Sequence, residues 1–302
     1  LFLLSNLGTP GNTAIHKYMN QKKVPQLFVT SGADKWADPA NYPWTMALLP
    51  SYRGEARIYA QYILATYPDA KIGVLYQNDD FGKDYLIGLK EGLGENASKL
   101  IVAEVPFEVS APTIDSQIVQ IKAANPAVFI NIGTPKFVAQ SIKKVGELNW
   151  KVVQIIPQVS TTIGGVIKPA GFENAQGVLS AYYLKDATDP KWKNDQGMIE
   201  WNAFMDKYLP DADRADSLYI YGYAVTQIMA QVLKQCGDDL TRENVMKQAA
   251  SLDMDVNMLL PGIRVKTSAS DYRPIEQLQM MRFSKDQWEL FGPILSSENK
   301  PM

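Results

Sequence analysis

The stretch Lys71-Ile-Gly-Val-Leu-Tyr-Gln-Asn-Asp-Asp-Phe-Gly82 joins a continuous apolar run to a polar turn. Its apolar half is typical of a strand that is buried on both faces. Apolar residues at helical spacing come before it, over residues 53–67, and a second helix is expected from the turn to about residue 94. A buried strand between two helices predicts a parallel sheet.

The same alternation continues on both sides of this stretch. It predicts strands at residues 24–30, 100–107, 127–132 and 152–156, and helices at residues 115–124 and 136–148. The opening residues Leu1-Phe-Leu-Leu4 are expected to be a strand already in progress, followed by a turn over residues 6–12. The sequence therefore favours the α/β class, with helices on both faces of a mostly parallel sheet.

The pattern changes after Gly177. A strand is expected at residues 178–184, then a polar loop at 186–195 and two long helices at 199–209 and 218–235. Thr241 has the side chain of a helix N-cap and is followed by an acidic residue, which predicts a further helix. Residues 280–283 and 288–291 are expected to close the chain as a hairpin.

Composition excludes several classes of protein. The 302 residues suggest about two domains. A single cysteine and a single histidine leave no disulfide framework, thiolate zinc cluster or histidine-rich metal site. A net charge of −2 argues against a general nucleic-acid binder. No apolar run approaches the roughly 18 residues of a membrane span.

No catalytic constellation emerges from the residues. No P-loop, nucleophile elbow or dinucleotide fingerprint is present. His16 is interpreted as a surface or packing residue, and Cys236 as a small buried apolar residue. Asp79 and Asp80 could hold a divalent cation, but the favoured interpretation is that they stabilise the start of the following helix.

Polar chemistry gathers where strands end, which is where ligands bind in open parallel sheets. The turns at residues 7–12, 30–33 and 133–135 offer hydroxyl groups and backbone N–H groups near helix starts. Aromatic residues lie on or near such ends: Trp36, Tyr52, Phe81 and Tyr183. Together they predict an apolar pocket with a few placed polar groups.

The chain resembles a known family at four places. They are Tyr76-Gln-Asn-Asp-Asp-Phe-Gly82, Val24-Pro-Gln-Leu-Phe-Val-Thr-Ser-Gly-Ala33, Asn131-Ile-Gly-Thr-Pro135 and Pro274-Ile-Glu-Gln-Leu-Gln-Met-Met-Arg-Phe283. These stretches look like type I periplasmic substrate-binding proteins of ABC importers, in the leucine/isoleucine/valine-binding branch. The resemblance runs the whole length and depends on the order of many weak matches.

The resemblance implies two α/β lobes that are joined by three crossing strands and close like a hinge. The first lobe would hold residues 1–48 and 183–273, and the second lobe residues 49–182 and 274–302. Family members begin with strand–helix units that are absent here, on the order of 100 residues. Part of the first lobe is therefore expected to be missing, and with it part of the ligand site.

The resemblance also implies which residues touch a ligand. Two first-lobe loops would hold a carboxylate, and second-lobe residues would contact the rest of the ligand. The expected residues are Thr9, Pro10 and Asn12 in the first loop, Thr30, Ser31, Gly32 and Ala33 in the second, and Tyr52, Phe81, Thr134 and Gln158. No catalytic residue, metal or cofactor is implied.

Gln158 stands where amino-acid-binding relatives carry a glutamate that pairs with the ligand's ammonium group. Removing one side of a buried ion pair commonly costs about 3–5 kcal/mol. A glutamine can still bond to an uncharged hydroxyl, amide or carbonyl. The hypothesis is a carboxylate ligand without an α-ammonium group, and the aromatic positions favour an aromatic acid. Two alternatives stay open: Asp34 replaces the missing charge, or Gln158 is only a loop residue.

The expected function is an extracytoplasmic, periplasmic solute receptor that delivers a small carboxylate to an ABC transporter permease. It would have no catalytic activity, no nucleic-acid partner and no direct membrane insertion. The alternative is a branched-chain amino acid or amide binding or sensing module of the same fold. An α/β enzyme is disfavoured, because the single histidine and the absent motifs leave no acid–base machinery.

Overall fold

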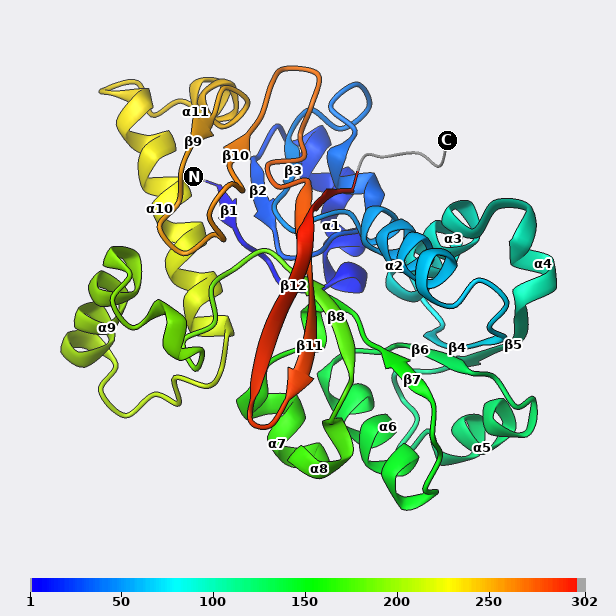
Figure 1. Cartoon of the computed structure of the whole chain (residues 1–302). Coiled ribbons are helices and arrows are strands. Elements are labelled where there is room, and N and C mark those ends of the chain that lie inside the picture. Colours follow the sequence, from blue (N-terminus) through cyan, green and yellow to red (C-terminus); the bar gives the residue numbers. More distant parts are fainter. Residues whose placement is uncertain (1, 298–302) are drawn as a thin grey trace.

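The computed structural model describes residues 2–297 and contains two main sheets with helices packed around each (Figure 1). We call the three-stranded sheet and its helices the small lobe, and the seven-stranded sheet and its helices the large lobe. An α/β fold with a mostly parallel sheet is therefore confirmed. The lobe boundaries near residues 48, 182 and 273 stay a prediction.

The large lobe is built on a sheet with the strand order β12-β11-β8-β7-β6-β4-β5. Its parallel strands are β4 (Ile72–Gln77), β5 (Ile101–Phe107), β6 (Val128–Ile132), β7 (Val153–Ile155) and β8 (Leu179–Tyr182). Every residue of β6 is buried, because helices cover both faces of the sheet. Strand β4, which ends in the turn at Gln77, lies between β6 and the edge strand β5 and is almost wholly buried, as its apolar sequence predicts.

Two pairs of helices cover the two faces of this sheet (Figure 1). On one face lie α2 (Tyr52–Thr66) and α3 (Asp80–Leu93), and on the other lie α5 (Asp115–Ala123) and α6 (Pro135–Glu147). Helices α2 and α3 approach closely: a Cβ atom on Gly88 would lie 2.3 Å from the Arg53 carbonyl oxygen. Glycine at residue 88 is what permits this contact.

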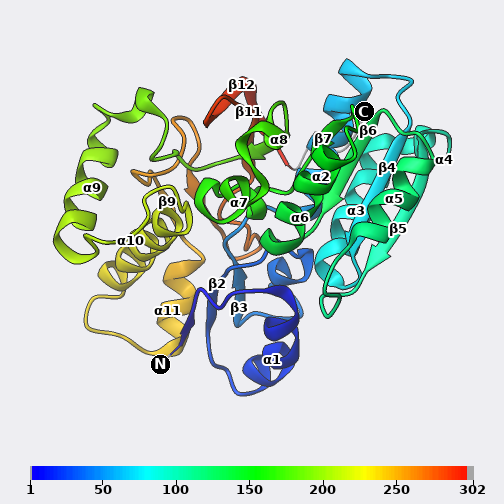
Figure 2. The same cartoon turned by 90° about the horizontal axis from the view of Figure 1, so that it is seen from below.

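The small lobe has the parallel sheet β1 (Leu3–Leu4), β2 (Gln26–Val29) and β3 (Thr45–Ala47). Helix α1 (Thr9–Gln21) connects its first two strands. The later helices are α9 (Gln196–Tyr208), α10 (Leu218–Cys236) and α11 (Arg242–Ala249). Figure 2 shows these three on the opposite side of the molecule from α3, α4 and α5.

Short elements complete the described chain. They are the 3-10 helices η1 (Asp34–Ala37), η2 (Gly94–Asn96), η3 (Gln158–Ser160) and η5 (Pro190–Trp192), the π-helix η4 (Ile163–Ile167), α4 (Ala97–Leu100), α7 (Lys168–Ala170), α8 (Phe172–Ala175), and the strand pair β9 (Asp253–Met254) and β10 (Val265–Lys266). Between residues 2 and 297, no helix is both long and apolar enough to cross a membrane.

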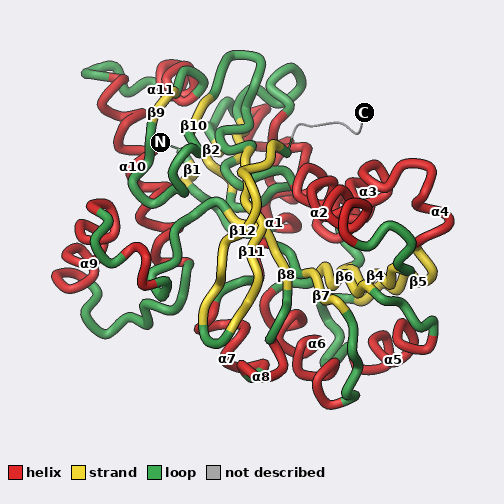
Figure 3. The backbone as a smooth tube through the Cα atoms, in the orientation of Figure 1, coloured by secondary structure: helices red, strands yellow, loops and turns green. Residues whose placement is uncertain are grey.

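Strands β11 (Gln277–Ser284) and β12 (Gln287–Ser296) form a long antiparallel ribbon that joins the large sheet beside β8 (Figure 3). This hairpin is the one expected from the sequence, although both strands are longer. The chain leaves the three-stranded sheet after β3, leaves the seven-stranded sheet after β8 for the segment that holds α9, α10, α11 and the pair β9–β10, and returns to the seven-stranded sheet at β11. Residues 298–302, which we assigned to the second lobe, lie outside the described residues.

The structure corrects some sequence expectations. Helix α1 begins at Thr9, inside the turn expected over residues 6–12, because Pro10 fits the first turn of a helix, where no intrahelical N–H bond is lost. Strand β1 covers only Leu3–Leu4 of the expected Leu1–Leu4, and Leu1 lies outside the described residues. Strand β3 follows the loop after η1 and was not predicted.

Candidate functional site

A cavity of about 330 Å³ lies between the two lobes. Its size falls at the lower end of ordinary small-molecule sites. Residues of both lobes line it, at the carboxyl ends of strands and the starts of helices. They are Leu7, Gly8, Thr9, Pro10, Thr30, Leu49, Tyr52, Gln77, Phe81, Thr134, Pro135, Gln158, Val159, Thr162, Tyr182, Tyr183, Ser217, Leu218 and Tyr221.

Seven of the residues expected at the site meet in this cavity: Thr9, Pro10, Thr30, Tyr52, Phe81, Thr134 and Gln158. They come from α1, from the end of β2, and from α2, α3, α6 and η3. Residues up to about 150 positions apart in the sequence are therefore brought to one place. Whether they bind a ligand stays a prediction.

The other four expected residues are not among those that line the cavity. The Asn12 amide is fully buried and braces the loop before α1, donating to the carbonyl oxygens of Asn6 and Gly8. Gly32 is packed so closely that a Cβ atom would lie 2.2 Å from the Pro50 carbonyl oxygen. Ser31 and Ala33 are buried behind the lining.

Hydroxyl groups gather at the small-lobe end of the cavity. The Thr9 and Ser31 hydroxyls share a hydrogen bond of 2.7 Å, and the Trp36 indole N–H donates to the same Ser31 oxygen. Trp36, an aromatic residue singled out in the sequence, is therefore a fully buried support and not a lining residue. Because α1 has no side-chain cap, its first N–H groups remain available at this end.

A second cluster of hydroxyl groups connects α10 to the sheet of the small lobe. The Tyr221 hydroxyl lies 2.7 Å from the Thr30 hydroxyl and 3.0 Å from the Ser5 hydroxyl. Burial raises the pKa of Tyr221 to about 12, so its phenol stays protonated at neutral pH. These contacts fix Tyr221 on the wall of the cavity.

Aromatic rings also line the cavity. Tyr52 and Phe81 meet edge to face with ring centroids 5.0 Å apart, and Tyr182 and Tyr183 lie 5.4 Å apart. Burial raises the pKa of Tyr182 to about 12 and the pKa values of Tyr52 and Tyr183 further above their usual value. The tyrosine hydroxyls are therefore neutral hydrogen-bonding groups.

Gln158 lies at the large-lobe end and is 3% exposed. Its backbone N–H donates to Oε1 of Glu55 at 2.8 Å, and its side-chain Nε2 atom has no hydrogen-bond partner among residues 2–297. The loop that carries Gln158 is thus anchored by a carboxylate, and Gln158 is among the residues that line the cavity. Gln158 is therefore a buried residue, and its contact with a ligand stays a prediction.

Glu55 is fully buried on α2 and is surrounded by donors. The Tyr59 hydroxyl donates to Oε1 at 2.5 Å and the Tyr85 hydroxyl donates to Oε2 at 2.7 Å. Burial raises the pKa of Glu55 from 4.5 to about 7, and these hydrogen bonds oppose the rise. Glu55 is not among the residues that line the cavity, and both of its carboxyl oxygens already accept hydrogen bonds from the protein.

No lysine, arginine, histidine, aspartate or glutamate side chain lines the cavity within the described residues. Asp34, the candidate replacement charge, is not a lining residue. Its carboxylate accepts hydrogen bonds from the Ser51 hydroxyl at 2.5 Å and from the Arg273 guanidinium at 3.1 Å. Asp34 is therefore neutralised outside the cavity.

The other reactive side chains have structural surroundings. His16 is buried against Trp36 and Tyr42, and burial lowers its pKa to about 4. Cys236 is buried as well. Asp79 caps α3 by accepting from the Gly82 N–H at 3.1 Å, as we favoured over a cation site. No cluster of three metal-binding side chains occurs in the described part of the chain.

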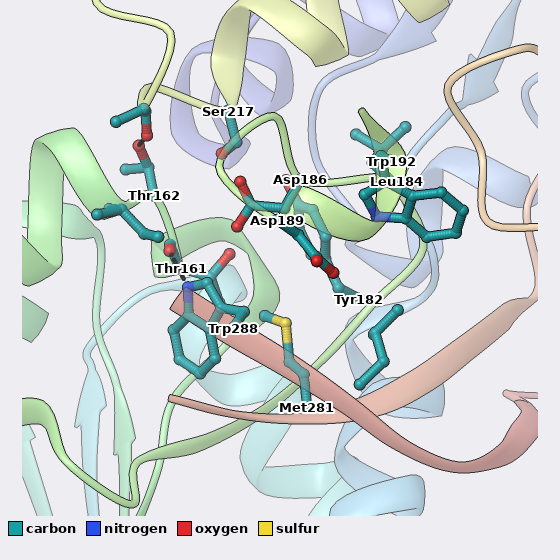
Figure 4. Close-up of a pocket in the computed structure, with 13 residues that line it drawn as sticks. Thr161, Thr162, Tyr182, Leu184, Asp186, Asp189, Trp192, Ser217, Met281 and Trp288 are labelled. Atoms are coloured by element: carbon teal, nitrogen blue, oxygen red, sulfur yellow. Dashed lines mark hydrogen bonds between the residues drawn. The ribbon is translucent and has the colours of Figure 1, made fainter. Parts of the chain in front are cut away.

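A second, water-sized cavity of about 20 Å³ adjoins the first and shares Thr162, Tyr182 and Ser217 with it. Figure 4 shows Asp186 and Asp189 among Tyr182, Ser217 and Trp192 on its walls. The Trp288 indole N–H donates to the Thr161 carbonyl oxygen at 2.8 Å and closes another side. Burial raises the pKa of Asp186 above its usual value.

Sequence reasoning missed several lining residues. Leu7, Gly8 and Pro135 lie inside the turns singled out at residues 7–12 and 133–135 but were not named as site residues, and Gln77 lies at the end of a strand, where the strand-end rule could have found it. Ser217, Leu218 and Tyr221 come from the first turns of α10, and no local signal in the sequence places them at a site. The remaining missed residues are Leu49, Val159, Thr162 and Tyr182; Tyr183 was noted only as an aromatic near a strand end.

The sequence matches the model of the periplasmic binding protein family over residues 2–287. The chain belongs to this family, and its architecture is the two-lobed type I fold of such proteins. No curated protein sequence matches the chain.

Solved structures share this fold at low sequence identity. A possible leucine/isoleucine/valine-binding protein from Rhodopirellula baltica is 15% identical, with a TM-score of 0.80 over 97% of this chain and 77% of its own. A branched-chain amino acid ABC transporter protein from Thermus thermophilus with bound valine is 16% identical, with a TM-score of 0.82 and the same coverage. A fatty acid ABC transporter substrate-binding protein from Thermomonospora curvata is 16% identical, with a TM-score of 0.80 over 99% of this chain and 76% of its own.

Proposed function

We propose that this chain is an extracytoplasmic solute receptor that captures a small aromatic acid between its lobes and delivers it to an ABC transporter permease. One observation carries the proposal: the cavity has five aromatic rings and no charged side chain in its described lining. A zwitterionic amino acid would bring an ammonium group that finds no carboxylate partner there. An acid without that group avoids the cost of an unpaired buried charge.

The ligand's carboxylate has a suitable place at the small-lobe end. Thr9 and Thr30 offer hydroxyl groups, and the uncapped start of α1 offers backbone N–H groups beside them. Helix N-termini favour negative charge. The aromatic rings would then contact the ligand's ring, in the offset or edge-to-face arrangements that such rings prefer.

Proteins of similar structure indicate which kinds of ligand have to be compared. Related proteins of known structure are described as binding valine or as serving fatty acid transport. Both kinds of ligand carry a carboxylate, and they differ in whether an ammonium group accompanies it. A branched-chain amino acid receptor, or a sensing module of the same fold, is therefore the competing candidate.

A thermal-shift panel of aromatic acids, short aliphatic acids, amides, leucine and valine tests the proposal. A ligand at a hundred times its dissociation constant should add about 2.7 kcal/mol to the free energy of unfolding. We expect the largest shift with aromatic acids. A shift with leucine or valine and none with aromatic acids would contradict the proposal.

The variant Gln158→Glu places a second carboxyl group beside Glu55, in a cavity lining without a cation. We expect it to weaken aromatic-acid binding at least tenfold at pH 7.5, about 1.4 kcal/mol. Isothermal titration calorimetry measures the change. The control is Gln120→Glu on the exposed side of α5, which should bind as the wild type does. Unchanged affinity in Gln158→Glu would remove Gln158 from the site.

A further inference from the structure

Both lobes contribute polar residues to the lining of the candidate cavity, and aromatic rings line it as well. Thr9 and Thr30 lie at the small-lobe end, and Thr134 and Gln158 lie at the large-lobe end. A simple aromatic acid such as benzoate has a polar group at one end only. The polar residues at the large-lobe end therefore indicate that the ligand carries a second polar group.

Helix α6 begins at the large-lobe end without a side-chain cap. The hydroxyl of its N-cap residue, Thr134, donates instead to Oε1 of Gln77 at 3.1 Å. Pro135 occupies the first turn and has no N–H group to donate. The Phe137 and Val138 N–H groups donate to the Thr134 carbonyl oxygen, so within the described first turn the Lys136 N–H is the one left to donate a hydrogen bond to an oxygen.

The buried amide of Gln158 is a second, independent observation that points to a ligand at this end. The residue is 97% buried and is among those that line the cavity, and its Nε2 atom, itself buried, has no hydrogen-bond partner within residues 2–297. Buried polar groups in proteins are nearly always paired. A ligand oxygen at this end would pair with the amide and remove the cost of leaving it unsatisfied.

The oxygen at this end has to be uncharged. No lysine, arginine or histidine is among the described lining residues, and the Glu55 carboxyl group lies directly behind the Gln158 backbone. A second carboxylate on the ligand would face Glu55 without a counter-ion. A hydroxyl group suits a glutamine side chain, because both can donate and accept.

We propose that the ligand is an aromatic acid with an uncharged oxygen group, such as a hydroxyl, on the side of its ring opposite the carboxylate. Gln158 and the start of α6 then determine specificity for this group. This inference rests on the proposed function and adds the second recognition point to it.

Calorimetry with four matched acids tests the inference: benzoate, 4-methylbenzoate, 4-hydroxybenzoate and terephthalate. The methyl and hydroxyl groups have similar size, so their comparison isolates the hydrogen bonds. A site that is built to bond a hydroxyl rejects the analogue without it. We expect 4-hydroxybenzoate to bind about tenfold or more tightly than 4-methylbenzoate, and terephthalate to bind more weakly than 4-hydroxybenzoate.

Two variants test which residues determine the preference for the hydroxyl ligand over the methyl ligand. In Gln158→Leu, or in Gln158→Met should the first fail to fold, the ratio between the hydroxyl and methyl ligands should fall to about threefold or less. In Thr9→Val, at the opposite end, affinity for all four acids should fall while the ratio is kept. Circular dichroism of each variant checks its folding.

The possible outcomes distinguish a failure of this inference from a failure of the proposed function. Equal binding of the hydroxyl and methyl ligands, or a ratio that survives in Gln158→Leu, overturns this inference and leaves the proposed function standing. Tighter binding of terephthalate overturns the claim that the group is uncharged. Binding of leucine or valine with no response to any of the four acids overturns the proposed function and this inference together.

Discussion

Glu55 links several elements of the fold through hydrogen bonds to its buried carboxyl group. Its two carboxyl oxygens accept from Tyr59, Tyr85 and the Gln158 backbone, which belong to α2, α3 and η3. The Tyr59 hydroxyl in turn lies 3.2 Å from the Ser180 hydroxyl of β8. One buried carboxyl group therefore links two helices, a site loop and a strand that leads to the other lobe.

The raised pKa of Glu55 predicts a pH dependence of stability. Because the folded protein raises the pKa from 4.5 to about 7, it holds a proton that the unfolded chain has released between these values. Stability from this group is present below pH 4.5 and is lost as the pH rises through 7. We expect the wild type to lose about 2–3 kcal/mol relative to Glu55→Gln between pH 5 and pH 8.

Urea unfolding of both proteins at several pH values measures this difference. The exposed Glu95 offers a control, since Glu95→Gln should follow the wild-type curve. Parallel curves for the wild type and Glu55→Gln would show that Glu55 does not titrate in this range.

Helices α3 and α11 both begin with a side-chain N-cap, but of the two only α3 supplies a residue that lines the cavity. Asp79 caps α3 through the Gly82 N–H at 3.1 Å, and Thr241 caps α11 through the Asn244 N–H at 3.3 Å. Helix α3 brings Phe81 to the cavity, and Asp79 also accepts a hydrogen bond from Gln77 at 2.5 Å. Helix α11 supplies no lining residue.

Removing the two caps should therefore separate stability from binding. Asp79→Ala and Thr241→Ala should each lower the free energy of unfolding by about 1 kcal/mol, as cap removal usually does. Only Asp79→Ala should weaken ligand binding, because it releases Gln77 and the turn before Phe81. Urea unfolding and calorimetry measure the two quantities, and equal effects on binding would contradict the expectation.

The elements also show what a single sequence can predict. Continuous apolar runs identified β4, β6 and the helices around them, because period and burial are local properties. The seven lining residues named in advance lie at strand ends or came from the family resemblance. Glu55 and Tyr221 were missed, since their roles come from partners far away in the sequence, such as Gln158 and Thr30.

At the scale of the whole molecule, charged residues join the two lobes beside the cavity. Asp34 of η1 pairs with Arg53 of α2 at 3.6 Å and with Arg273 at 3.1 Å, and Lys35 pairs with Asp80 of α3 at 2.5 Å. The pairs Asp34–Arg53 and Lys35–Asp80 connect η1 of the small lobe to helices α2 and α3 of the large lobe. We expect them to favour the closed arrangement that holds a ligand.

The variant Asp34→Asn tests this expectation. Exposed or half-exposed pairs are each worth up to about 1 kcal/mol, so ligand affinity should fall about threefold to tenfold at low salt, with a smaller effect at high salt. The ranking of aromatic acids over leucine should stay the same, whereas a counter-charge role for Asp34 would change it. Asp69→Asn, in an exposed pair with Lys99 inside the large lobe, should leave affinity unchanged.

The strand order of the large sheet has a consequence for how the protein is made. Strands β4 to β8 emerge first during synthesis, but β11, which covers the open side of β8, follows about a hundred residues later. Until then the nascent chain carries an unpaired strand edge, the kind of surface through which chains aggregate. We expect a chain interrupted before residue 277 to aggregate rather than to yield a smaller working receptor.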